Sequence, residues 1–448
     1  METIRIKRGL DLPITGGPEQ EIRDGPAVET VAVLGPDYVG MRPTMSVDVG
    51  DRVKEGQVLF ADKKTPGVLY TSPACGEVLA VNRGAKRALQ SVVVRIAGEE
   101  RETFSQYSEA QIEQLAAEEV RDNLVRSGLW TALRTRPFGK VPPPESSPRS
   151  IFVTAMDTNP LAARADVVVA EAADDFVLGL KVLSRLAPKV FVCRSPGAAI
   201  PGGDLGGVEI AEFDGPHPAG LAGTHIHFLD PAGRERTVWH LNYQDAIAVG
   251  RLFVTGRLDQ RRVISLAGPA VKNPRLIRTR VGASIEQLVE GELEEGDNRI
   301  ISGSVLSGHA AEGPLAFLGR YHLQVSALVE GRQRRLFGWV MPGFDMFSVV
   351  NVFASALAPA KQFPLTTELH GGPRAIVSIG AYEKVMPLEL MPTFLLQALE
   401  VDDVEQAEAL GCLELDEDDL ALCTFVSPGK TDWGAILRRN LTIIEKEG

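Results

Sequence analysis

The sequence predicts a multidomain protein in which β and α/β domains are followed by a helical C-terminal domain. Alternating apolar positions with frequent turns fill residues 40–97, and buried strands flank an amphipathic helix over 151–193. Glycine and proline contribute 44 and 29 of the 448 residues, which favours turns and short strands over a helical bundle. This length is enough for about two to four domains of ordinary size.

Composition excludes several classes of protein. Hydrophobic residues make up 44% and charged residues 24%, as in a soluble globular protein. No apolar run approaches the ~18 residues that a spanning helix needs, and the N-terminus METIRIKRGLDLPITGG has no apolar core typical of a signal peptide. The four cysteines are scattered without a CxxC pair, which predicts a reducing compartment. We therefore expect a cytosolic protein, unless it docks on a partner at a membrane.

The net charge of −12 comes mainly from one acidic segment. Eleven acidic residues and no Lys or Arg lie between Glu389 and Asp419. The rest of the chain is nearly neutral, so attraction to nucleic acid or anionic lipid is not expected. The segment itself predicts a solvated acidic helical face.

The first half of the chain predicts a small β-sandwich or barrel over 40–97, followed by a helix. A capping box of Ser108 and Gln111 begins this helix, which runs to about Gly128. A proline-rich linker, VPPPESSP, follows at 141–148.

The next hundred residues predict a parallel α/β unit. IFVTAM and VFVC read as buried strands on either side of a helix, and this order is typical of parallel sheets. The apolar side of that helix carries Phe176, Leu180, Leu183 and Ala187. HIHFLD, VWHLNY and RLFVTG are expected to be further strands up to about residue 255.

The last part of the chain predicts two more units. Residues 261–291 read as strand, turn, strand and short helix, and IISGSVLSG closes that unit. The last sixty residues are expected to be helical, with breaks at Pro387, Pro392 and Pro428.

One stretch, SGLWTALRTRPFGK, combines arginines with aromatic residues: Trp130, Arg134, Arg136 and Phe138. Such a set suits a flat, partly polar ligand, because aromatics contact a ring and arginines donate to carbonyl oxygens. The alternative, equally compatible with the sequence, is an anchor between domains with packed aromatics and paired arginines. A second loop, LGPDYVGMRP, carries Tyr38, Met41 and Arg42, and an ordinary loop into the barrel is favoured there.

Three histidines, His217, His225 and His227, lie close together in GPHPAGLAGTHIHF. His225 and His227 share a face if this segment is a strand. No carboxylate or thiol stands at a recognisable ligand spacing, so local hydrogen bonding is favoured over a metal site. The chain has no Walker loop and no G-x-S-x-G elbow, and GPHPAGLAG is a weak candidate for a phosphate cradle.

Residues 40–97 resemble the biotinyl/lipoyl carrier sandwich through VxxGDxVxxGQxL and TSPxxGxV. Lys63 and Lys64 come too soon after Leu59 to be the carrier lysine. The resemblance implies that the fold is kept and the modified lysine is absent.

The whole chain also resembles the C subunit of the Rnf complex and, more distantly, the flavin subunit of complex I, with the cofactor ligands removed. LWTALRTRPF stands where these families have a glycine-rich flavin loop, and Met156–Pro160 stands where they have E-C-E-P. Ferredoxin-type cysteines would fall on Ile376, Ile379, Tyr382 and Met386, and on Glu417, Leu420, Cys423 and Ser427. Only one of these eight positions is a cysteine.

The most extensive resemblance is to the A subunits of Na+-translocating NADH:quinone oxidoreductases. It is carried by IKRGLDLPITG, GLWTALRTRPF, AMDTNPLA, FDGPHPAGLAGTHIHF, NYQDAIAVGRLF, ISGSVLSG, LGRYHLQVS and LGCLELDEDDLALCTFVSPGK. It implies a lipoyl-like barrel-sandwich hybrid over 1–100 and a Rossmann-like α/β domain over 101–256. It further implies an SLBB-type β-grasp module over 257–330 and a C-terminal region over 331–448 that ends in a helical domain.

The resemblance implies a peripheral protein on the cytoplasmic side of the bacterial inner membrane, docked on the membrane-embedded B subunit. The family complex couples NADH oxidation and ubiquinone reduction to Na+ export through flavins and iron–sulfur centres, none of which this chain is expected to hold. We expect a quinone site at Trp130, Arg134, Arg136 and Phe138, with Tyr38, Met41 and Arg42 opposite. The alternative is a pure scaffold without quinone contact.

Overall fold

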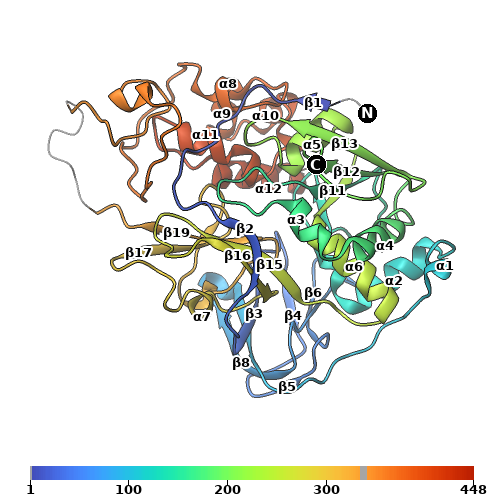
Figure 1. The fold of residues 1–448 in the computed structure, drawn as a ribbon. Coiled ribbons are helices and arrows are strands. Elements are labelled where there is room, and N and C mark those ends of the chain that lie inside the picture. Colours follow the sequence, from blue (N-terminus) through green and yellow to red (C-terminus); the bar gives the residue numbers. More distant parts are fainter. Residues whose placement is uncertain (1–2, 333–340, 448) are drawn as a thin grey trace.

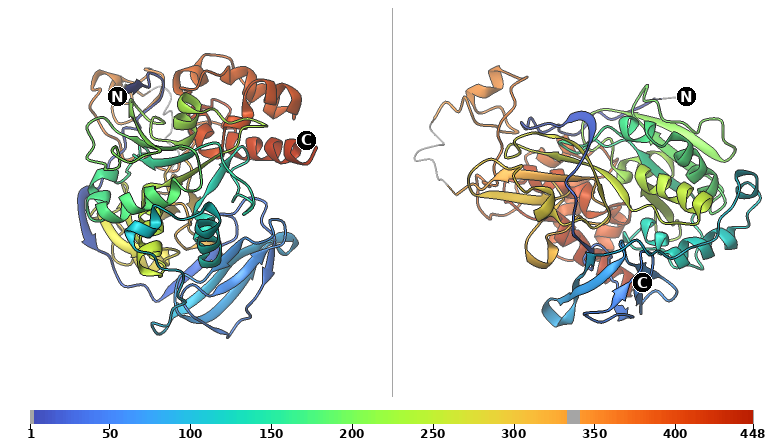
Figure 2. Two further views of the ribbon diagram at one scale, coloured as in Figure 1. Left: turned by 90° about the vertical axis from the view of Figure 1, so that its right-hand side faces the viewer. Right: turned by 60° about the horizontal axis from the view of Figure 1, so that its bottom comes forward.

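The computed structural model describes residues 3–332 and 341–447. These residues form four sheets and a group of C-terminal helices. In Figure 1 and in the left view of Figure 2, the first sheets (blue) lie at the bottom and the C-terminal helices (red) at the top. The order of β, α/β and helical parts agrees with the predicted fold class.

The barrel-sandwich domain consists of two antiparallel sheets. The first has the order β3-β9-β8-β5 and the second the order β4-β6-β7. Their apolar faces meet in a core in which Phe60 stacks on Tyr70, with ring centroids 4.6 Å apart. The strands are β3 (Thr30–Leu34), β4 (Pro43–Met45), β5 (Arg52–Val53), β6 (Val58–Asp62), β7 (Leu69–Thr71), β8 (Gly76–Arg83) and β9 (Leu89–Ile96).

Residues 3–24 lie outside this domain and add edge strands to two other sheets. β1 (Thr3–Arg5) pairs in parallel with β13, and β2 (Glu19–Asp24) pairs in parallel with β16. Pairing of this kind satisfies the backbone groups at an otherwise open sheet edge. The N-terminal segment therefore ties the α/β domain to the β-grasp module.

The α/β domain is built on a six-stranded sheet of order β1-β13-β12-β11-β14-β10. Its neighbours pair in parallel except β10 and β14, which are antiparallel. The strands after β1 are β10 (Arg134–Arg136), β11 (Ile151–Ala155), β12 (Val190–Arg194), β13 (Val208–Asp214) and β14 (Val238–Asn242). The predicted strands at 151–156 and 190–193 are confirmed.

Both faces of this sheet are buried. Because side chains alternate along each strand, a single strand contributes residues to two cores. Ile151 and Val153 join a core that includes the helices α3 (Ala165–Ala170), α4 (Ala173–Leu183) and α6 (Tyr243–Thr255). Phe152 points to the opposite core, against α5 (Ala222–Leu229). Strands that are covered on both faces are apolar throughout, which is why they could be recognised in the sequence.

Two segments predicted as strands are helices. HIHFLD lies in α5 and RLFVTG in α6, where ten of the thirteen residues of α6 are buried. A fully buried helix and a buried strand both appear as apolar runs, so periodicity did not separate them. The Asn242 side chain caps α6 by accepting a hydrogen bond from the Asp245 backbone N–H.

The predicted helix from Ser108 to Gly128 is two helices, α1 (Glu109–Ile112) and α2 (Ala117–Ser127). The capping box at Ser108 is present, but the chain leaves the helical conformation and starts again at Ala116. Gly128 ends α2 with a φ of 76°, a conformation that glycine adopts without strain.

The β-grasp module has a sheet of order β18-β17-β19-β15-β16-β2. Its elements confirm the predicted strand, turn, strand and short helix. They are β15 (Arg261–Ala267), β16 (Arg275–Arg280), α7 (Ile285–Leu288), β17 (Asn298–Ser302), β18 (His309–Ala310) and β19 (Gln324–Val329).

The C-terminal helices pack around a separate core that contains Tyr382, Cys423 and Trp433. Pro392 was predicted to break a helix, but it stands in the first turn of α9. Its fixed φ and missing N–H are tolerated at that position. The helices are α8 (Ala381–Val385), α9 (Pro392–Glu400), α10 (Val404–Ala409), α11 (Ala421–Val426) and α12 (Trp433–Glu447).

We predict that Gly179→Ala destabilises the α/β domain, because α4 and α6 approach each other closely at this glycine. An added Cβ would lie 1.9 Å from the Ala246 carbonyl oxygen. We expect the free energy of unfolding in urea to fall by about 1–3 kcal/mol. Gly206→Ala, where no atom lies within 4 Å of the added Cβ, serves as the control. Equal stability of the two variants would contradict this packing.

Candidate functional site

A cavity of about 440 Å³ lies between the α/β sheet, the β-grasp module and the C-terminal helices. Ligands of parallel α/β sheets commonly bind beyond the carboxyl ends of the strands, and residues following β11 and β14 line this cavity. The lining includes Asp37, Arg134, Arg136, Met156, Asp157, Asn159, His240, Tyr243, Ser304, Tyr321, His322, Asp416, Asp418 and Asp419.

Two arginines of β10 and two aspartates of the C-terminal region form a buried ion cluster at one wall. Arg136 donates from Nη1 to Asp416 Oδ2 at 2.6 Å and from Nη2 to Asp419 Oδ2 at 3.3 Å. Arg134 also donates to Asp416 Oδ2. Arg438, on α12, donates to the other oxygen of Asp416 at 2.6 Å. Three guanidinium groups thus share one carboxylate and join β10 to the C-terminal helices.

The buried aspartates correct the prediction of a solvated acidic face. The side chains of Asp416 and Asp419 are 2% exposed, because arginines distant in sequence neutralise them. Outside this pair the segment does present exposed acids, including Glu400, Asp402 and Glu405.

Burial and charge act in opposite directions on the two aspartates. Burial tends to raise the pKa of Asp416, but the Arg136 and Arg134 charges hold it well below its usual range. At Asp419 burial dominates and raises the pKa to about 6, despite Arg136. Asp416 is therefore the permanent counter-ion of the cluster.

The arginines retain unused hydrogen-bond donors. The Nε atoms of Arg134 and Arg136 are buried and have no acceptor among the described residues. Arg134 also lies 4.8 Å from the ring centroid of Tyr321, which is cation–π range. Burial, followed by the Arg136 charge, lowers the pKa of His240 well below its usual value, so its imidazole is neutral. The cavity is thus lined by two guanidinium groups, a neutral imidazole and an aromatic ring.

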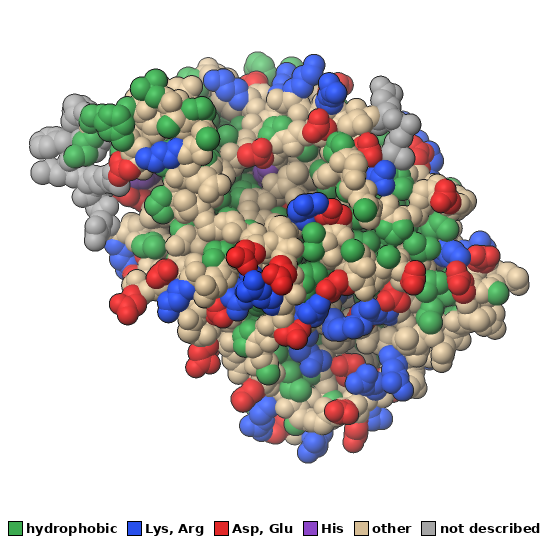
Figure 3. Space-filling model, viewed as in Figure 1, with side chains coloured by type: hydrophobic (Ala, Val, Ile, Leu, Met, Phe, Trp, Pro, Cys, Tyr) green, Lys and Arg blue, Asp and Glu red, His purple; other side chains and the backbone are tan. Residues whose placement is uncertain are grey.

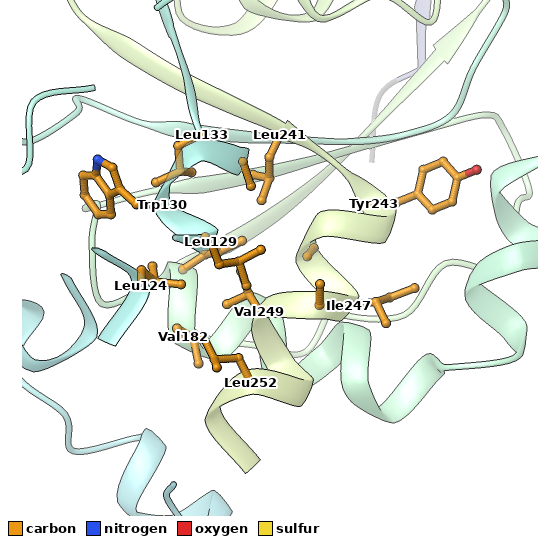
Figure 4. Packing of buried hydrophobic residues seen from close by; sticks show 14 of the residues in the cluster. Leu124, Leu129, Trp130, Leu133, Val182, Leu241, Tyr243, Ile247, Val249 and Leu252 are labelled. Atoms are coloured by element: carbon orange, nitrogen blue, oxygen red, sulfur yellow. The ribbon is translucent and has the colours of Figure 1, made fainter. Parts of the chain in front are cut away.

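The two predicted aromatics of the arginine loop pack away from this cavity. Trp130 is fully buried, donates from Nε1 to the Pro142 carbonyl at 2.7 Å and meets Trp239 edge to face. Figure 4 shows it beside the cluster formed by α2, β14 and α6. Phe138 packs against the core of the C-terminal helices. Packed aromatics and paired arginines are the features expected of an anchor between domains.

The three residues predicted to form the opposite wall lie near the cavity but do not line it. Tyr38 is buried between Tyr70 and Tyr321, whose ring centroids lie 4.5 and 6.2 Å away. Met41 is half-buried against the same core and Arg42 is exposed. None of these three lines the cavity, but their neighbours Asp37 and Val39 do.

The three histidines make hydrogen bonds within the protein, but only His225 bonds to a residue close to it in sequence. His225 and His227 lie on α5, not on a strand, so they do not share a face. His225 Nε2 lies 3.0 Å from the Ala219 carbonyl oxygen, and His227 Nδ1 lies 2.8 Å from Glu414 Oε2. His217 Nδ1 lies 3.2 Å from Thr158 Oγ1. Within residues 3–332 and 341–447, no group of three His, Cys, Asp or Glu side chains is placed to hold a metal ion.

Side chains fill several positions at which ferredoxin-type motifs carry cysteines. Tyr382, Met386, Leu420 and Cys423 all belong to the buried core of the C-terminal helices. Burial raises the pKa of the Cys423 thiol to about 12, which disfavours the thiolate that a cluster needs.

Several cavity residues were not predicted, chiefly Asp37, His240, Tyr321, Asp416 and Asp419. His240 could have been inferred, because it lies in the predicted strand VWHLNY. That strand pairs with β11, and Met156 follows β11. The aspartates gave no such signal, since only the fold brings them to β10.

Family models identify the class of protein that this fold represents. The NqrA N-terminal barrel-sandwich hybrid domain matches residues 4–97, and the NqrA second alpha/beta domain matches 115–258. The NQRA C-terminal domain, of SLBB type, matches residues 263–313. These matches confirm the predicted barrel-sandwich, Rossmann-like and β-grasp parts.

Curated relatives identify the family. The chain is 58% identical to the A subunit of the Na(+)-translocating NADH-quinone reductase of Pasteurella multocida over 99% of this chain and 100% of that protein. Identity to the A subunit from Pseudomonas aeruginosa (strain PAO1) is also 58%, with the same coverage. A crystal structure of an NAD+-reducing NiFe hydrogenase is 15% identical, with a TM-score of 0.34 over 49% of this chain and 48% of its own. The chain belongs to the family of A subunits of Na(+)-translocating NADH-quinone reductases.

We predict that Asp416→Asn strongly destabilises the protein, because it removes the carboxylate that Arg134, Arg136 and Arg438 share and leaves Arg136 only its longer contact with Asp419. Loss of one partner of a buried pair costs about 3–5 kcal/mol, to be measured by urea unfolding. Glu405→Gln removes an exposed acid from the same segment and should change stability by less than about 0.5 kcal/mol. A stable Asp416→Asn variant would show that the cluster does not hold the C-terminal helices.

We also predict that buried His225 makes folding pH-dependent. Burial lowers its pKa to about 3, whereas an unfolded chain takes up the proton near pH ~6.5. The unfolded state therefore binds more protons, and stability falls as the pH drops below ~6.5, by about 2 kcal/mol for this group at pH ~5. His225→Leu should lose less stability than the parent between pH ~7 and ~5 in urea titrations. If the variant keeps the pH dependence of the parent, His225 is not a neutral buried imidazole. His370→Leu, which removes an exposed histidine, is the control.

Proposed function

We propose that this chain is a peripheral, cofactor-free subunit of the complex and contributes to quinone binding and assembly. In this proposal the complex uses NADH, flavins, iron–sulfur centres and Na+, while this chain contributes residues that contact ubiquinone. The single observation that carries the quinone assignment is the 440 Å³ cavity, whose lining brings Arg134, Arg136 and Tyr321 together.

The charge balance of the cavity suits a neutral ring. Asp416 and Asp419 neutralise the two arginines, so the wall has no excess positive charge to attract an anion. The guanidinium groups of Arg134 and Arg136 are hydrogen-bond donors in the cavity lining, and the carbonyl oxygens of a quinone are matching acceptors. The Tyr321 ring offers an aromatic surface beside Arg134. In this arrangement Trp130, Phe138, Tyr38 and Met41 support the walls by packing.

The absence of a flavin and of iron–sulfur clusters from this chain remains part of the proposal. It is supported by the residues that occupy the corresponding positions. The segment Leu129–Ala132 is completely buried, so bulky side chains stand where a flavin loop needs glycine. Only Cys423 among the eight ferredoxin-type positions is a cysteine.

Docking on the membrane-embedded B subunit, on the cytoplasmic side, is the second part of the proposal. The described residues include no helix of the length and apolarity needed to cross a bilayer. Ion translocation needs a membrane-spanning path, which in this proposal other subunits provide. Exposed apolar side chains such as Phe344, Val352 and Leu357 are suited to contact with another protein of the complex.

A pure scaffold is the second candidate function, and the ion cluster favours it. Arg134 and Arg136 bind Asp416 directly, so their first role is to join two parts of the chain. Ubiquinone would then be reduced without contact with this chain. The two functions differ in whether the isolated chain binds quinone at all.

We predict that Arg134→Lys weakens quinone binding while preserving the fold. Lysine keeps a positive charge beside Asp416 but has one donor nitrogen, whereas the guanidinium group has three. We therefore expect the hydrogen bond to the quinone to be lost, and loss of one hydrogen bond should weaken binding about tenfold. Ligand-observed NMR with ubiquinone-1 and the full-length protein measures this affinity.

Arg438→Lys is the matched control, because Arg438 binds the same carboxylate but does not line the cavity. It should keep the parental affinity within about twofold. Absence of ubiquinone-1 binding to the parent protein would support the scaffold, and equal affinities of the two variants would remove Arg134 from the site.

A further inference from the structure

A second and larger cavity, of about 1020 Å³, lies where the barrel-sandwich domain, the α/β domain and the β-grasp module meet. Its wall contains five arginines and only three carboxylates, although the whole chain carries a net charge of −12. Figure 3 shows Lys and Arg side chains over the lower part of the face that it displays, with Asp and Glu side chains among them. A concave site with excess positive charge concentrates anions.

All three carboxylates are already occupied. Arg251 donates to Asp175 at 2.6 Å and to Asp259 at 2.5 Å, and Arg261 donates to Asp259 at 2.8 Å. Arg280 donates to Glu55 at 3.2 Å and to the Pro73 carbonyl at 2.7 Å. These pairs fix the wall of the cavity and use up its negative charge.

Two arginines, Arg101 and Arg257, are not held by an ion pair with these carboxylates, although Arg101 Nε donates to the Glu99 carbonyl at 3.5 Å. Burial raises the pKa of Glu55, and the Arg280 and Arg101 charges oppose this rise. Both are exposed and line the cavity, and neither forms an ion pair within 4.0 Å with a described carboxylate. Burial lowers the pKa of Arg280, Glu55 raises it, and the Arg101 charge lowers it further. Arg101 and Arg280 therefore repel each other, and a bound anion would relieve that repulsion.

The remaining lining fits the organic part of such an anion. Val28, Val254 and Leu258 are half-buried apolar side chains, and Gln106 and Gln260 provide amide groups. Arginine forks match phosphate oxygens, and an apolar surface with a few amides suits a purine ring. We propose that this cavity binds a nucleoside diphosphate or polyphosphate, with Arg101 and Arg257 on the phosphates.

The test is isothermal titration calorimetry of the full-length protein with ADP at low salt, with inorganic pyrophosphate as competitor. We expect saturable binding that pyrophosphate reduces and that weakens as salt is raised. The double variant Arg101→Gln, Arg257→Gln should bind ADP at least about tenfold more weakly. Both residues are exposed, so the variant should fold.

The control is Arg52→Gln, Arg87→Gln, which removes the same charge from exposed arginines outside the cavity and should keep the affinity within about twofold. Equal weakening in both double variants would reduce the effect to net charge and overturn the proposal. Absence of ADP binding would also overturn the proposal. This includes the case in which cardiolipin vesicles, and not ADP, bind through Arg101 and Arg257. Because these variants leave the Arg134 cavity intact, the outcome is independent of quinone binding.

Discussion

The buried carboxylate of Asp416, shared by Arg134, Arg136 and Arg438, is the interaction on which the remainder of the site depends. A single unpaired charge at this depth would lower the stability of the protein by several kcal/mol, so removal of any one of the four groups is expected to destabilise the others. Through them the edge strand β10 of the α/β sheet is fixed to α12 and to the segment before α11. The wall of the 440 Å³ cavity is a consequence of this junction.

The pairing of arginines with carboxylates differs between the two cavities. At Arg134 and Arg136 the positive charge is cancelled by Asp416 and Asp419, and what remains is hydrogen-bond donation without net attraction for anions. A neutral carbonyl compound suits that environment. The larger cavity keeps two uncompensated arginines, Arg101 and Arg257, and therefore suits phosphates. We therefore propose that these two arginine-lined sites bind different classes of ligand, because their carboxylates are distributed differently.

Much of the fold could be predicted, because strand patterns and capping signals are local. β11, β12, β15 and β16 lie where apolar runs and turns placed them. HIHFLD in α5 and RLFVTG at the end of α6 were predicted as strands, since a helix buried on nearly all sides has no polar face to reveal its period. The candidate site was predicted only in part: the arginines were found from their unusual neighbours, whereas Trp130 and Phe138 proved to be packing residues. Asp416 and Asp419 were missed because nothing local distinguishes a buried acid from a solvated one in an acidic segment.

The central claim is that a quinone contacts this chain at the cavity between β10, β14 and the C-terminal helices. Photoaffinity labelling of the full-length protein with an azido-ubiquinone, followed by peptide mapping, tests it most directly. We predict label on the cavity-lining residues Thr154, Met156, Asp157 or Asn159, or on residues 321–324. Excess ubiquinone-1 should remove this label. Label confined to the barrel-sandwich domain, or label that excess ubiquinone-1 does not displace, would contradict the account.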